Sequence, residues 1–361
     1  MVARGHTVLA LAPDYDDATR AAVFALGAEP VSYSLSRTGI NPVKDAIDML
    51  RLTILLKKIS PEIILSYISK PVIYGTLAAW LARVPCRLAL ITGLGYAFTP
   101  SAETKILKRR LLRSIVLCLY RIALKHADKV FFQNEDDRAF FFNEGVVHAA
   151  QSIRINGTGV DLDWWHPALP VTKPVTFLLA ARLLREKGII EFVEAARLVK
   201  ATYPESHFIL LGGLDTNPGA LSYAEVKAWE EENILEWPGH VPDIRPWLAR
   251  SSVYVLPSYY REGVPRSTQE AMAMARPIIT TNTPGCRDTV IDGQNGFLVP
   301  VRDVEALAVA MAHFILQPEM IGKMGQASRK IAEELFDVRK INQTIIDEMD
   351  KLIALKCYEG R

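Results

Sequence analysis

The chain has 361 residues, of which 50% are hydrophobic and 23% are charged. This is the composition of an ordinary globular protein, and the length predicts about two domains. The formal net charge of +2 gives no general reason to expect a nucleic acid as partner. Cys86, Cys118, Cys286 and Cys357 lack the spacing of a metal site or a disulfide framework, so we expect a reducing cytoplasm. No signal peptide is visible, and the longest clean apolar run, Pro71–Ala82, is too short to span a bilayer.

Strand-like and helix-like runs alternate along the first half of the chain. The pattern predicts strands at residues 7–11, 62–66, 86–92 and 129–133, and helices at 41–59, 71–82 and 104–126. The start is unusual, because Arg4–Val8 reads as the end of a helix, capped by Gly5, that leads into a second strand. The first strand, Gly-rich turn and helix of a doubly wound unit, roughly 20–30 residues, are therefore expected to be missing. That strand is central in this topology, so its loss would expose the edges of its neighbours.

The alternation restarts after a Trp- and Pro-rich junction at Trp164–Pro174. It predicts strands at residues 176–180, 207–211, 234–236, 253–256, 277–281 and 296–299. Helices are predicted at 189–202, 221–232, 244–249, 267–275 and 304–316. The order predicts an α/β protein with two doubly wound halves.

Two cations lie where the first strand of the second half gives way to a helix. Arg182 follows that strand, and Lys187 precedes the helix that begins near residue 189. This corner suits a diphosphate, although solvated loop charges are an equal interpretation of the spacing alone. Further on, Gly212 and Gly213 end a buried strand, where the backbone can approach a ligand or simply turn. His240 follows the next strand in a loop that could contact a nucleobase through its backbone, while the imidazole reads as an ordinary loop residue.

Two glutamates, Glu262 and Glu270, stand eight positions apart. Glu262 is predicted on a loop at the carboxyl end of a buried strand, where open α/β sheets bind ligands, and Glu270 on the helix that follows. Glu270 could accept hydrogen bonds from a diol such as ribose, and Glu262 could face a reacting sugar. Gly263 and Val264 would offer backbone N–H groups, which Pro265 lacks. A helix-terminal charge and a surface residue are the alternative interpretations of the two acids.

These elements occur in a distinctive order along the chain: Arg182 to Lys187, Gly212-Gly213, Gly239-His240, Glu262-x7-Glu270, Pro284-Gly285 and Asn295-Gly-Phe-Leu-Val299. In that order they resemble the family 4 retaining glycosyltransferases, which have the GT-B fold. The resemblance is strong over about residues 150–320 and looser before them. Ala181 departs from it, since a glycine often precedes the arginine, but an alanine is a small change.

The resemblance implies two Rossmann-like domains that face each other across a cleft. The expected domains are an acceptor-side domain at 1–163 with a shortened start, a nucleotide-sugar-binding domain at 164–340, and a C-terminal helix at 341–361 that packs back on the first domain. On the donor side it implies that Arg182 and Lys187 hold the diphosphate, that Glu270 binds the ribose, and that Glu262 contacts the transferred sugar. Gly263–Pro265 would line the sugar pocket, with Gly212 and His240 as further donor-side residues.

The resemblance also carries over retention of the anomeric configuration. No residue is a convincing covalent nucleophile, so we expect front-face transfer, in which the leaving diphosphate helps to deprotonate the acceptor and the two cations stabilise its charge. Asp161-Leu-Asp163 imitates the metal-binding Asp-x-Asp of the other main glycosyltransferase fold. We interpret it as structural, because a cationic diphosphate site does not require a metal. No metal and no cofactor are therefore expected.

The acceptor side is less specific. Gly93 and Gly95 end a strand and would let an acceptor or the sugar approach the backbone, or form a plain turn, and the histidine that many relatives place near here is not seen. A helix with many basic residues and no acid follows, including Lys105, Lys108, Arg109, Arg110 and Arg113. It suits anionic lipid headgroups or a polyprenyl diphosphate, and its alternative interpretation is a core helix with a solvated basic face. This loop and helix resemble the family's enzymes that extend lipid-linked oligosaccharides.

The predicted function is transfer of a hexose or N-acetylhexosamine from a nucleotide sugar, UDP-linked, to a lipid-linked or polysaccharide acceptor. The expected location is cytoplasmic and peripheral, at an anionic inner membrane face. Two alternatives stay open: a nucleotide-sugar-binding protein made inactive by the shortened first domain, and a sugar phosphorylase of the same fold, whose pyridoxal or phosphate site is not seen.

Overall fold

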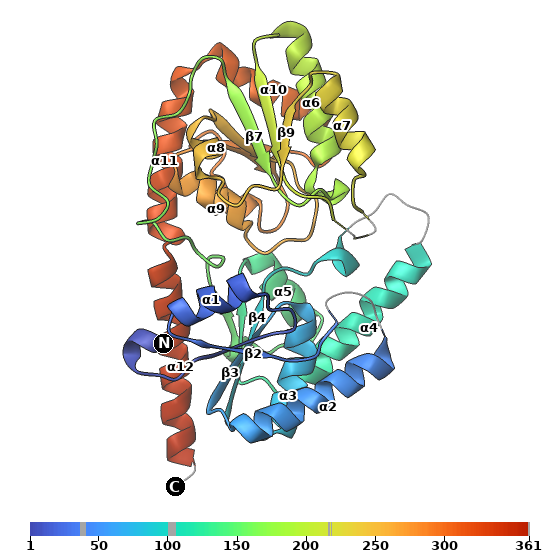
Figure 1. Cartoon of the computed structure of the whole chain (residues 1–361), viewed down its shortest axis with the longest axis vertical. Coiled ribbons are helices and arrows are strands. Elements are labelled where there is room, and N and C mark those ends of the chain that lie inside the picture. The colour runs from blue at the N-terminus through green and yellow to red at the C-terminus, as the bar shows by residue number, and fades with distance from the viewer. Residues whose placement is uncertain (37–40, 100–105, 216, 218, 360–361) are drawn as a thin grey trace.

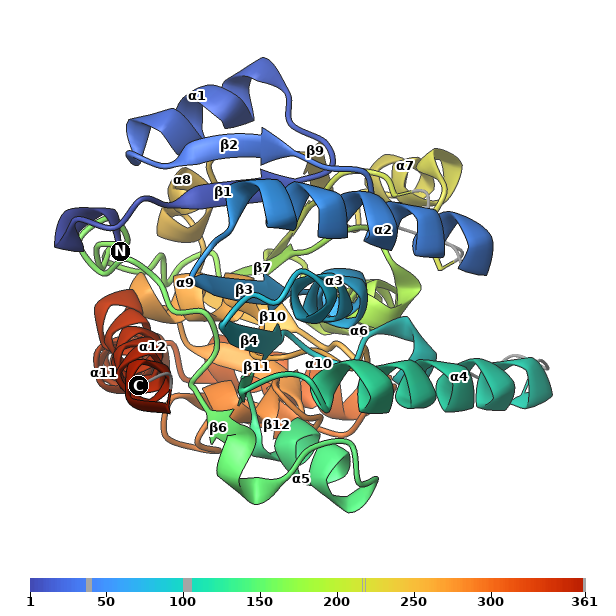
Figure 2. The same ribbon diagram turned by 90° about the horizontal axis from the view of Figure 1, so that it is seen from below.

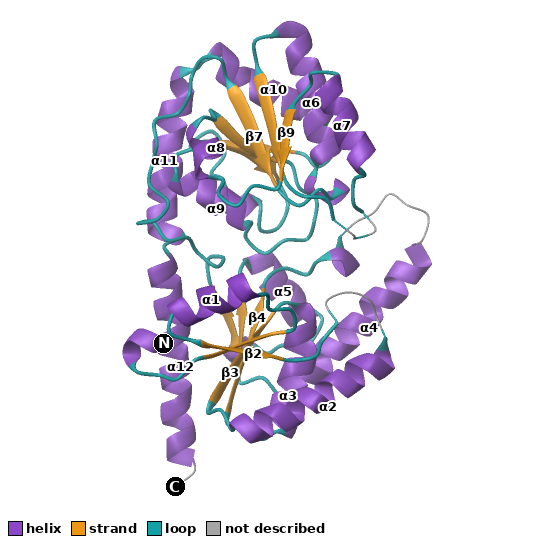
Figure 3. Ribbon diagram, viewed as in Figure 1, coloured by secondary structure: helices purple, strands orange, loops and turns teal. Residues whose placement is uncertain are grey.

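The computed structural model describes residues 1–36, 41–99, 106–215, 217 and 219–359. The chain forms two lobes, one above the other in Figure 1, each with its own parallel strands. Loops fill most of the space where the lobes meet, and the strands of each lobe stay within it (Figure 3). This is the α/β arrangement that the alternation of elements predicts.

The first lobe divides its strands between two sheets. A two-stranded sheet pairs β1 with β2, and a four-stranded sheet has the order β3-β4-β5-β6; all pairs are parallel. The strands are β1 (Leu9–Ala12), β2 (Glu29–Ser32), β3 (Ile63–Tyr67), β4 (Cys86–Ile91), β5 (Lys129–Phe132) and β6 (Ser152–Arg154). The helices are α1 (Asp17–Ala25), α2 (Pro42–Ile59), α3 (Thr76–Leu81), α4 (Ile106–Leu124) and α5 (Glu135–Asn143). Among the described strands, none lies between β1 and β3, so each of these two has an unpaired edge.

Helices join the two sheets of the first lobe. Leu52 and Leu56 of α2 and Ala78 and Ala79 of α3 form a buried cluster, against which Leu11 of β1 packs. In Figure 2 the β1–β2 pair lies beside α2, while β3 and β4 lie further down the same lobe. Apolar contact through α2 and α3 therefore takes the place of backbone hydrogen bonds between the sheets.

The second lobe has one continuous six-stranded sheet in the order β12-β11-β10-β7-β8-β9. Its strands are β7 (Thr176–Ala180), β8 (His207–Leu211), β9 (Glu236–Gly239), β10 (Val253–Leu256), β11 (Ile278–Thr281) and β12 (Gly296–Val299). Its helices are α6 (Ile189–Thr202), α7 (Tyr223–Glu231), α8 (Arg245–Ala249), α9 (Arg266–Ala273) and α10 (Val304–Leu316). All neighbouring strands are parallel.

The central strand of this sheet is buried on both faces. Phe177 and Leu179 of β7 join a cluster under α6 and α10, and Leu178 and Ala180 join a second cluster under α9. Successive side chains of a strand point to opposite faces, so a strand covered on both sides is apolar throughout. Burial of each large apolar side chain contributes about 1.5–3 kcal/mol to folding. The rigid sheet that results fixes the loops at its carboxyl edge.

One predicted strand is misplaced. The sequence predicts a strand at 234–236, but β9 covers Glu236–Gly239 and includes Pro238. Proline cannot donate a ladder hydrogen bond, so the sequence predicts a loop for the Trp-Pro-Gly segment. β9 is the edge strand of its sheet, and an edge position tolerates proline because that N–H position faces away from the ladder.

Two chain segments cross between the lobes side by side. The first crosses near Val160, and the second at Phe336–Val338, between α11 (Glu319–Leu335) and α12 (Val338–Glu359). The Val160 N–H donates to the Phe336 carbonyl at 2.8 Å, and the Val338 N–H donates to the Val160 carbonyl at 3.1 Å. After the crossing, α12 packs Met349 and Leu352 against β4 and β5 of the first lobe. Figure 1 shows α11 and α12 along one side of both lobes.

Within the described part of the chain, no single helix is long and apolar enough to cross a membrane. The helices α10 and α11 meet that criterion only together, and they are bent by 109° where they join.

Candidate functional site

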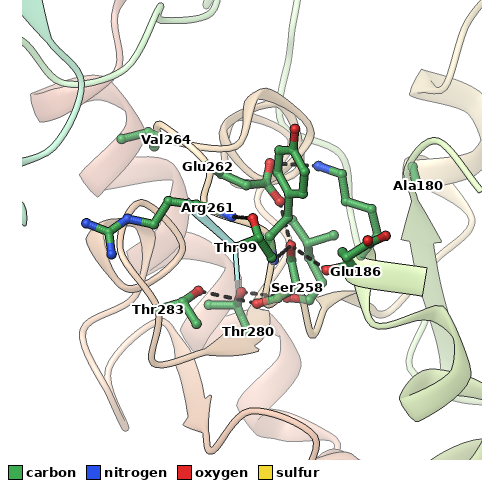
Figure 4. A network of polar contacts seen from close by, with 12 residues as sticks. Thr99, Ala180, Glu186, Ser258, Arg261, Glu262, Val264, Thr280 and Thr283 are labelled. Carbon is green, nitrogen blue, oxygen red and sulfur yellow. Dashed lines mark hydrogen bonds and ion pairs between the residues drawn. The ribbon is translucent and has the colours of Figure 1, made fainter. Parts of the chain in front are cut away.

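Glu262 lies on the loop between β10 and α9, at the carboxyl edge of the second sheet. Its carboxylate has two partners: the Lys187 ammonium at 2.7 Å and the Ser258 hydroxyl, which donates at 2.7 Å. All three side chains are largely buried. The Thr283 hydroxyl donates to the Ser258 carbonyl at 3.3 Å, which holds the start of the loop (Figure 4). The acid predicted to face a sugar is thus paired with a cation predicted to face a diphosphate.

Lys187 is positioned by a short helical turn, Arg185–Lys187, that ends in Gly188. Gly188 has φ 76°, and a Cβ there would lie 2.1 Å from the Pro257 carbonyl oxygen. Only glycine combines that left-handed conformation with so close an approach. The turn after β7 and the loop after β10 are therefore packed directly together, and this brings Lys187 to Glu262.

Arg182 lies at the same sheet edge and is 57% exposed at its side chain, with its guanidinium 3.2 Å from Asp215. Gly212 and His240, the other predicted donor-side residues, lie in the next two loops. A Cβ at Gly212 would lie 2.0 Å from the Ala181 carbonyl oxygen, and one at Gly213 would lie 3.3 Å from the His240 Cβ. These loops line one edge beside Arg182, and the roles of their residues stay predictions.

Glu270 lies in α9, and Arg266 donates to its carboxylate at 2.9 Å. Burial raises the pKa of Glu270, and the Arg266 charge opposes that rise. Tyr254 is buried beneath both predicted acids: burial first, then the charges of Glu270 and Glu262, raise the pKa of its hydroxyl. The two glutamates of the x7 spacing therefore lie near one buried hydroxyl, which donates to the Ala180 carbonyl at 3.0 Å.

The backbone N–H groups predicted to serve a ligand are already bonded. The Gly263 N–H donates to the Thr92 carbonyl at 3.2 Å, and the Val264 N–H donates to Gln133 Oε1 at 3.0 Å. Pro265, which has no N–H, precedes α9. In this structure the first lobe occupies both amides, and their predicted contact with a phosphate or hydroxyl stays a prediction. Whether the segment lines a sugar pocket stays a prediction.

The predicted acceptor-side glycines lie against the Glu262 loop. A Cβ at Gly93, which has φ 110°, would lie 2.4 Å from the Gly263 nitrogen. The Gly95 N–H donates to the Arg261 carbonyl at 2.9 Å, and the Thr99 hydroxyl accepts from the Arg261 N–H at 2.9 Å. Glycine is needed here because two backbones from different lobes meet.

A turn of the first lobe that the sequence reasoning missed also contacts this loop. It spans Gln133–Asp137, between β5 and the first turn of α5, and its Asp137 carboxylate accepts from Arg261 Nε at 3.0 Å. Figure 4 shows the side chains of Arg261 and Glu262 pointing in opposite directions from one short segment. The sequence does contain an indication of this turn. Asn134 and three acids, Glu135–Asp137, directly follow a buried strand, at the sheet edge where sites form.

The basic helix is α4, and the structure tests only part of the prediction made for it. Lys105 lies outside the described residues, as do the side chains of Lys108 and Arg109. Arg110 is exposed, whereas Arg113 lies over the Phe140 ring and pairs with Glu144 of the segment after α5 at 3.2 Å. Arg113 is therefore partly engaged within the protein, although 46% of its side chain is exposed.

Asp161 and Asp163 lie at the crossing between lobes rather than at the sheet edge. The Asp163 N–H donates to the Asp161 carboxylate at 3.0 Å, and the Asp163 carboxylate pairs with Arg339 of α12. No group of three His, Cys, Asp or Glu side chains suited to a metal ion occurs among the described residues.

Two family models match the chain on either side of the lobe crossing. "Glycosyl transferase 4-like" matches residues 23–134, and "Glycosyl transferases group 1" matches residues 174–317. The second match spans the corner of Arg182 and Lys187 together with both glutamates. The chain belongs to the family 4 glycosyltransferases.

Relatives of this glycosyltransferase agree with that assignment. It is 27% identical, over 91% of its length and 87% of the relative's, to the N,N'-diacetylbacillosaminyl-diphospho-undecaprenol alpha-1,3-N-acetylgalactosaminyltransferase of Campylobacter jejuni. It is also 27% identical to the UDP-Gal:alpha-D-GlcNAc-diphosphoundecaprenol alpha-1,3-galactosyltransferase of Escherichia coli, over 75% and 71% of the two chains. Its fold matches Anabaena Alr3699/HepE, solved in complex with UDP and glucose, with a TM-score of 0.75, 19% identity, and coverage of 95% and 91%. The glycosyltransferase thus has the GT-B fold.

Proposed function

We propose that this glycosyltransferase moves a hexose or N-acetylhexosamine from a UDP-linked donor to a lipid-linked acceptor, with retention of configuration and without a metal. A saccharide carried on a polyprenyl diphosphate is the acceptor that the two curated relatives favour by their names. The observation that carries the proposal is the Lys187–Glu262 pair at the sheet edge, facing the glycine loop of the other lobe. That pair joins a cation for a diphosphate to an acid for a sugar.

In this proposal Arg182 and Lys187 bind the donor diphosphate. The Lys187 ammonium has three N–H donors, so it can contact a phosphate oxygen while it still contacts Glu262. As the bond from the sugar to the phosphate breaks, negative charge grows on the leaving diphosphate, and the two cations stabilise that charge more than the charge of the bound donor. Glu270 accepts hydrogen bonds from the ribose hydroxyls.

Glu262 faces the transferred sugar, where its carboxylate accepts from hydroxyl groups and stabilises positive charge that develops at the anomeric carbon. Of the described side chains, Lys187 and Ser258 lie nearest to it and both are already paired with its carboxylate, which supports front-face transfer. The Cys286 thiol, whose pKa is affected by the Glu262 charge, is buried, and burial raises that pKa to about 12. The thiol therefore stays protonated and does not attack, and the leaving diphosphate takes the acceptor proton.

The proposal places the first lobe at an anionic membrane surface. Four apolar side chains, Val43, Ile47, Leu50 and Ile54, form one exposed stripe on α2, each between 45% and 70% exposed. Residues Leu111, Ile115 and Ile122 repeat that spacing on α4, at 42–63% exposed. Figures 1 and 2 both show α2 and α4 projecting to the same side of the lobe, with α3 between them.

Basic residues accompany both stripes: Lys44, Arg51, Lys57 and Lys58 on α2, Arg110 and Arg121 on α4, and Lys125 directly after α4. An apolar stripe bordered by cations suits the interface of an anionic bilayer. A peripheral position on the cytoplasmic face of a membrane would bring the cleft to a lipid-linked acceptor.

A panel of UDP-sugars against polyprenyl-diphosphate-linked saccharides tests the proposal, with the anomeric configuration of the product read by NMR. We expect one donor to give an axial-to-axial product, with transfer unchanged by a chelator and reduced at least about 100-fold in Glu262→Gln. Glu194→Gln, an exposed acid on α6, is the matched control and should keep full activity.

Three results would contradict the proposal. Full activity in Glu262→Gln would remove its assigned role, and inversion of configuration would exclude front-face transfer. A chain that binds UDP but turns over no donor in the panel would instead be a nucleotide-sugar-binding protein.

A further inference from the structure

The backbone of the Glu262 loop makes five hydrogen bonds to the opposite lobe from four consecutive residues, 261–264. The donors and acceptors on the loop are the Arg261 N–H and carbonyl, the Glu262 carbonyl, the Gly263 N–H and the Val264 N–H. Their partners in the first lobe are Thr99 Oγ1, the Gly95 N–H, Asn134 Nδ2, the Thr92 carbonyl and Gln133 Oε1, at 2.9–3.3 Å. The acid belongs to the second lobe by sequence, but its backbone is positioned by the first.

The 133–137 turn supplies the side chains of this contact, and it is itself rigid. Gln133, Asn134 and Asp137 are almost fully buried. Asn134 Oδ1 accepts from the Asp137 N–H at 2.8 Å as the cap of α5, and Asn134 Nδ2 donates both to Asp137 Oδ2 at 3.2 Å and to the Glu262 carbonyl at 3.3 Å. Asp137 Oδ1 accepts from Arg261 Nε. The first turn of α5 and its cap therefore bind the side chain of Arg261, through Asp137, and the carbonyl of Glu262, through Asn134.

We propose that Thr99, Asn134 and Asp137 are positioning residues for transfer, acting through Arg261 and the Glu262 backbone, so that Glu262 reaches its working geometry only when the lobes are closed. This inference rests on the proposed function, in which Glu262 faces the sugar. The donor cations Arg182 and Lys187 lie outside the contact, so donor binding does not need it. Binding of the donor and transfer of its sugar therefore depend on different contacts: the first on the two cations, the second also on the contact between the lobes.

The separation follows from how the contact is built. Lys187 and Ser258, the side-chain partners of Glu262, belong to the second lobe and stay with it when the lobes part. The backbone bonds would break on parting, because hydrogen bonds weaken steeply with distance and angle. In an open state the loop would keep its charges yet lose its fixed position, and small errors of position reduce rates strongly.

The test uses Asp137→Asn and Thr99→Val, with Asp136→Asn as the matched control. Asp136 is the neighbouring exposed acid, and its carboxylate lies 3.8 Å from the Arg287 guanidinium. We expect kcat to fall about tenfold or more in the two variants, while the Kd for UDP stays within about twofold of the parent value. Arg261→Lys should recover part of the activity lost in Arg261→Gln, because it restores a cation beside Asp137. Amide hydrogen exchange over residues 261–264 should accelerate in both test variants and stay at the parent rate in the control.

Thr99→Val keeps the shape of the buried side chain, so it remains informative if Asp137→Asn folds poorly. Unchanged kcat with unchanged exchange in folded variants would overturn the inference, and so would parallel loss of kcat and UDP affinity. If the parent chain transfers no sugar at all, the proposed function fails. The exchange and UDP measurements still decide whether the first lobe fixes the loop independently of donor binding.

Discussion

The two halves of the chain arrange their parallel strands in different ways. The second half forms one continuous six-stranded sheet. The first half divides its strands between a pair and a group of four, and helices pack between these two sheets. The carboxyl edge of the continuous sheet brings Arg182, Lys187, Glu262 and Glu270 together from segments far apart in the chain. In the first half, the loops after β4 and β5 reach across to the second lobe and bond to the backbone of the Glu262 loop.

This difference predicts where substitutions act. Changes at the donor edge should alter binding without altering the rest of the molecule, because the sheet beneath it is complete. Substitutions in the first lobe should instead change where Glu262 lies, or how the protein sits at a membrane. Three measurements sharpen or break that contrast.

The largest effect is expected at the donor cations. Arg182→Ala and Lys187→Ala should each weaken UDP binding by about 1.5–3 kcal/mol, roughly 10- to 150-fold, because each removes a charged hydrogen bond to the diphosphate. Titration calorimetry measures it. The control is Arg185→Ala, on the same turn, whose guanidinium pairs with Glu225. A weakening no larger than that of the control would remove the two cations from the site.

A smaller effect is expected for the membrane surface of the first lobe. Leu50→Glu with Ile54→Glu on α2 should reduce binding to anionic vesicles by about tenfold, because each change removes apolar area and adds a charge that the anionic surface repels. Co-sedimentation with phosphatidylglycerol vesicles measures it, and neutral vesicles should bind weakly throughout.

The control for that measurement is Leu198→Glu with Val309→Glu, a pair of exposed apolar residues in the second lobe. Equal loss in both pairs would mean that α2 has no special role at the surface.

The smallest effect concerns pH. Burial raises the pKa of Glu270, so its carboxylate becomes protonated at a higher pH than an ordinary glutamate as the solution is acidified. Donor affinity should therefore decline on the acid side with a midpoint above the usual value of 4.5. Arg266→Gln should move the midpoint further up, because the Arg266 charge opposes the rise. Glu270→Gln should remove this dependence; a decline that persists in that variant would assign it elsewhere.

Much of the second lobe follows from its sequence. Strands at 176–180, 207–211, 253–256 and 296–299 have the predicted bounds, because a buried parallel strand is an unbroken apolar run between turn residues. The GT-B fold and the glycosyltransferase family are confirmed. α1, β2 and β6 were not predicted: the two strands have only four and three residues, and no residue of α1 is buried, so their apolar pattern is weak. The residue roles at the donor edge stay predictions.

The contacts between the two lobes could not be predicted from the sequence. Nothing in Thr99, Gln133 or Asp137 alone indicates that its partner is more than 120 positions away, since that depends on how two folded bodies meet. The sequence predicts that Gly93 and Gly95 leave room for a ligand, whereas in the structure the Glu262 loop lies against both glycines.

The paired crossing of the chain at Val160 and Phe336–Val338 limits how the protein can open. The two crossing segments are joined by hydrogen bonds along one side of the protein, so the main motion left to the lobes is a rotation about that side. Gln269 ties the start of α9 to this axis by accepting from the Gly159 N–H at 3.0 Å. α4 and α7 lie on the side away from α11 and α12 in Figure 1, so displacement grows toward them. A turn about this axis would therefore separate α4 and α7 furthest, and it would part the Glu262 loop from the first lobe by a smaller distance that still breaks its backbone hydrogen bonds.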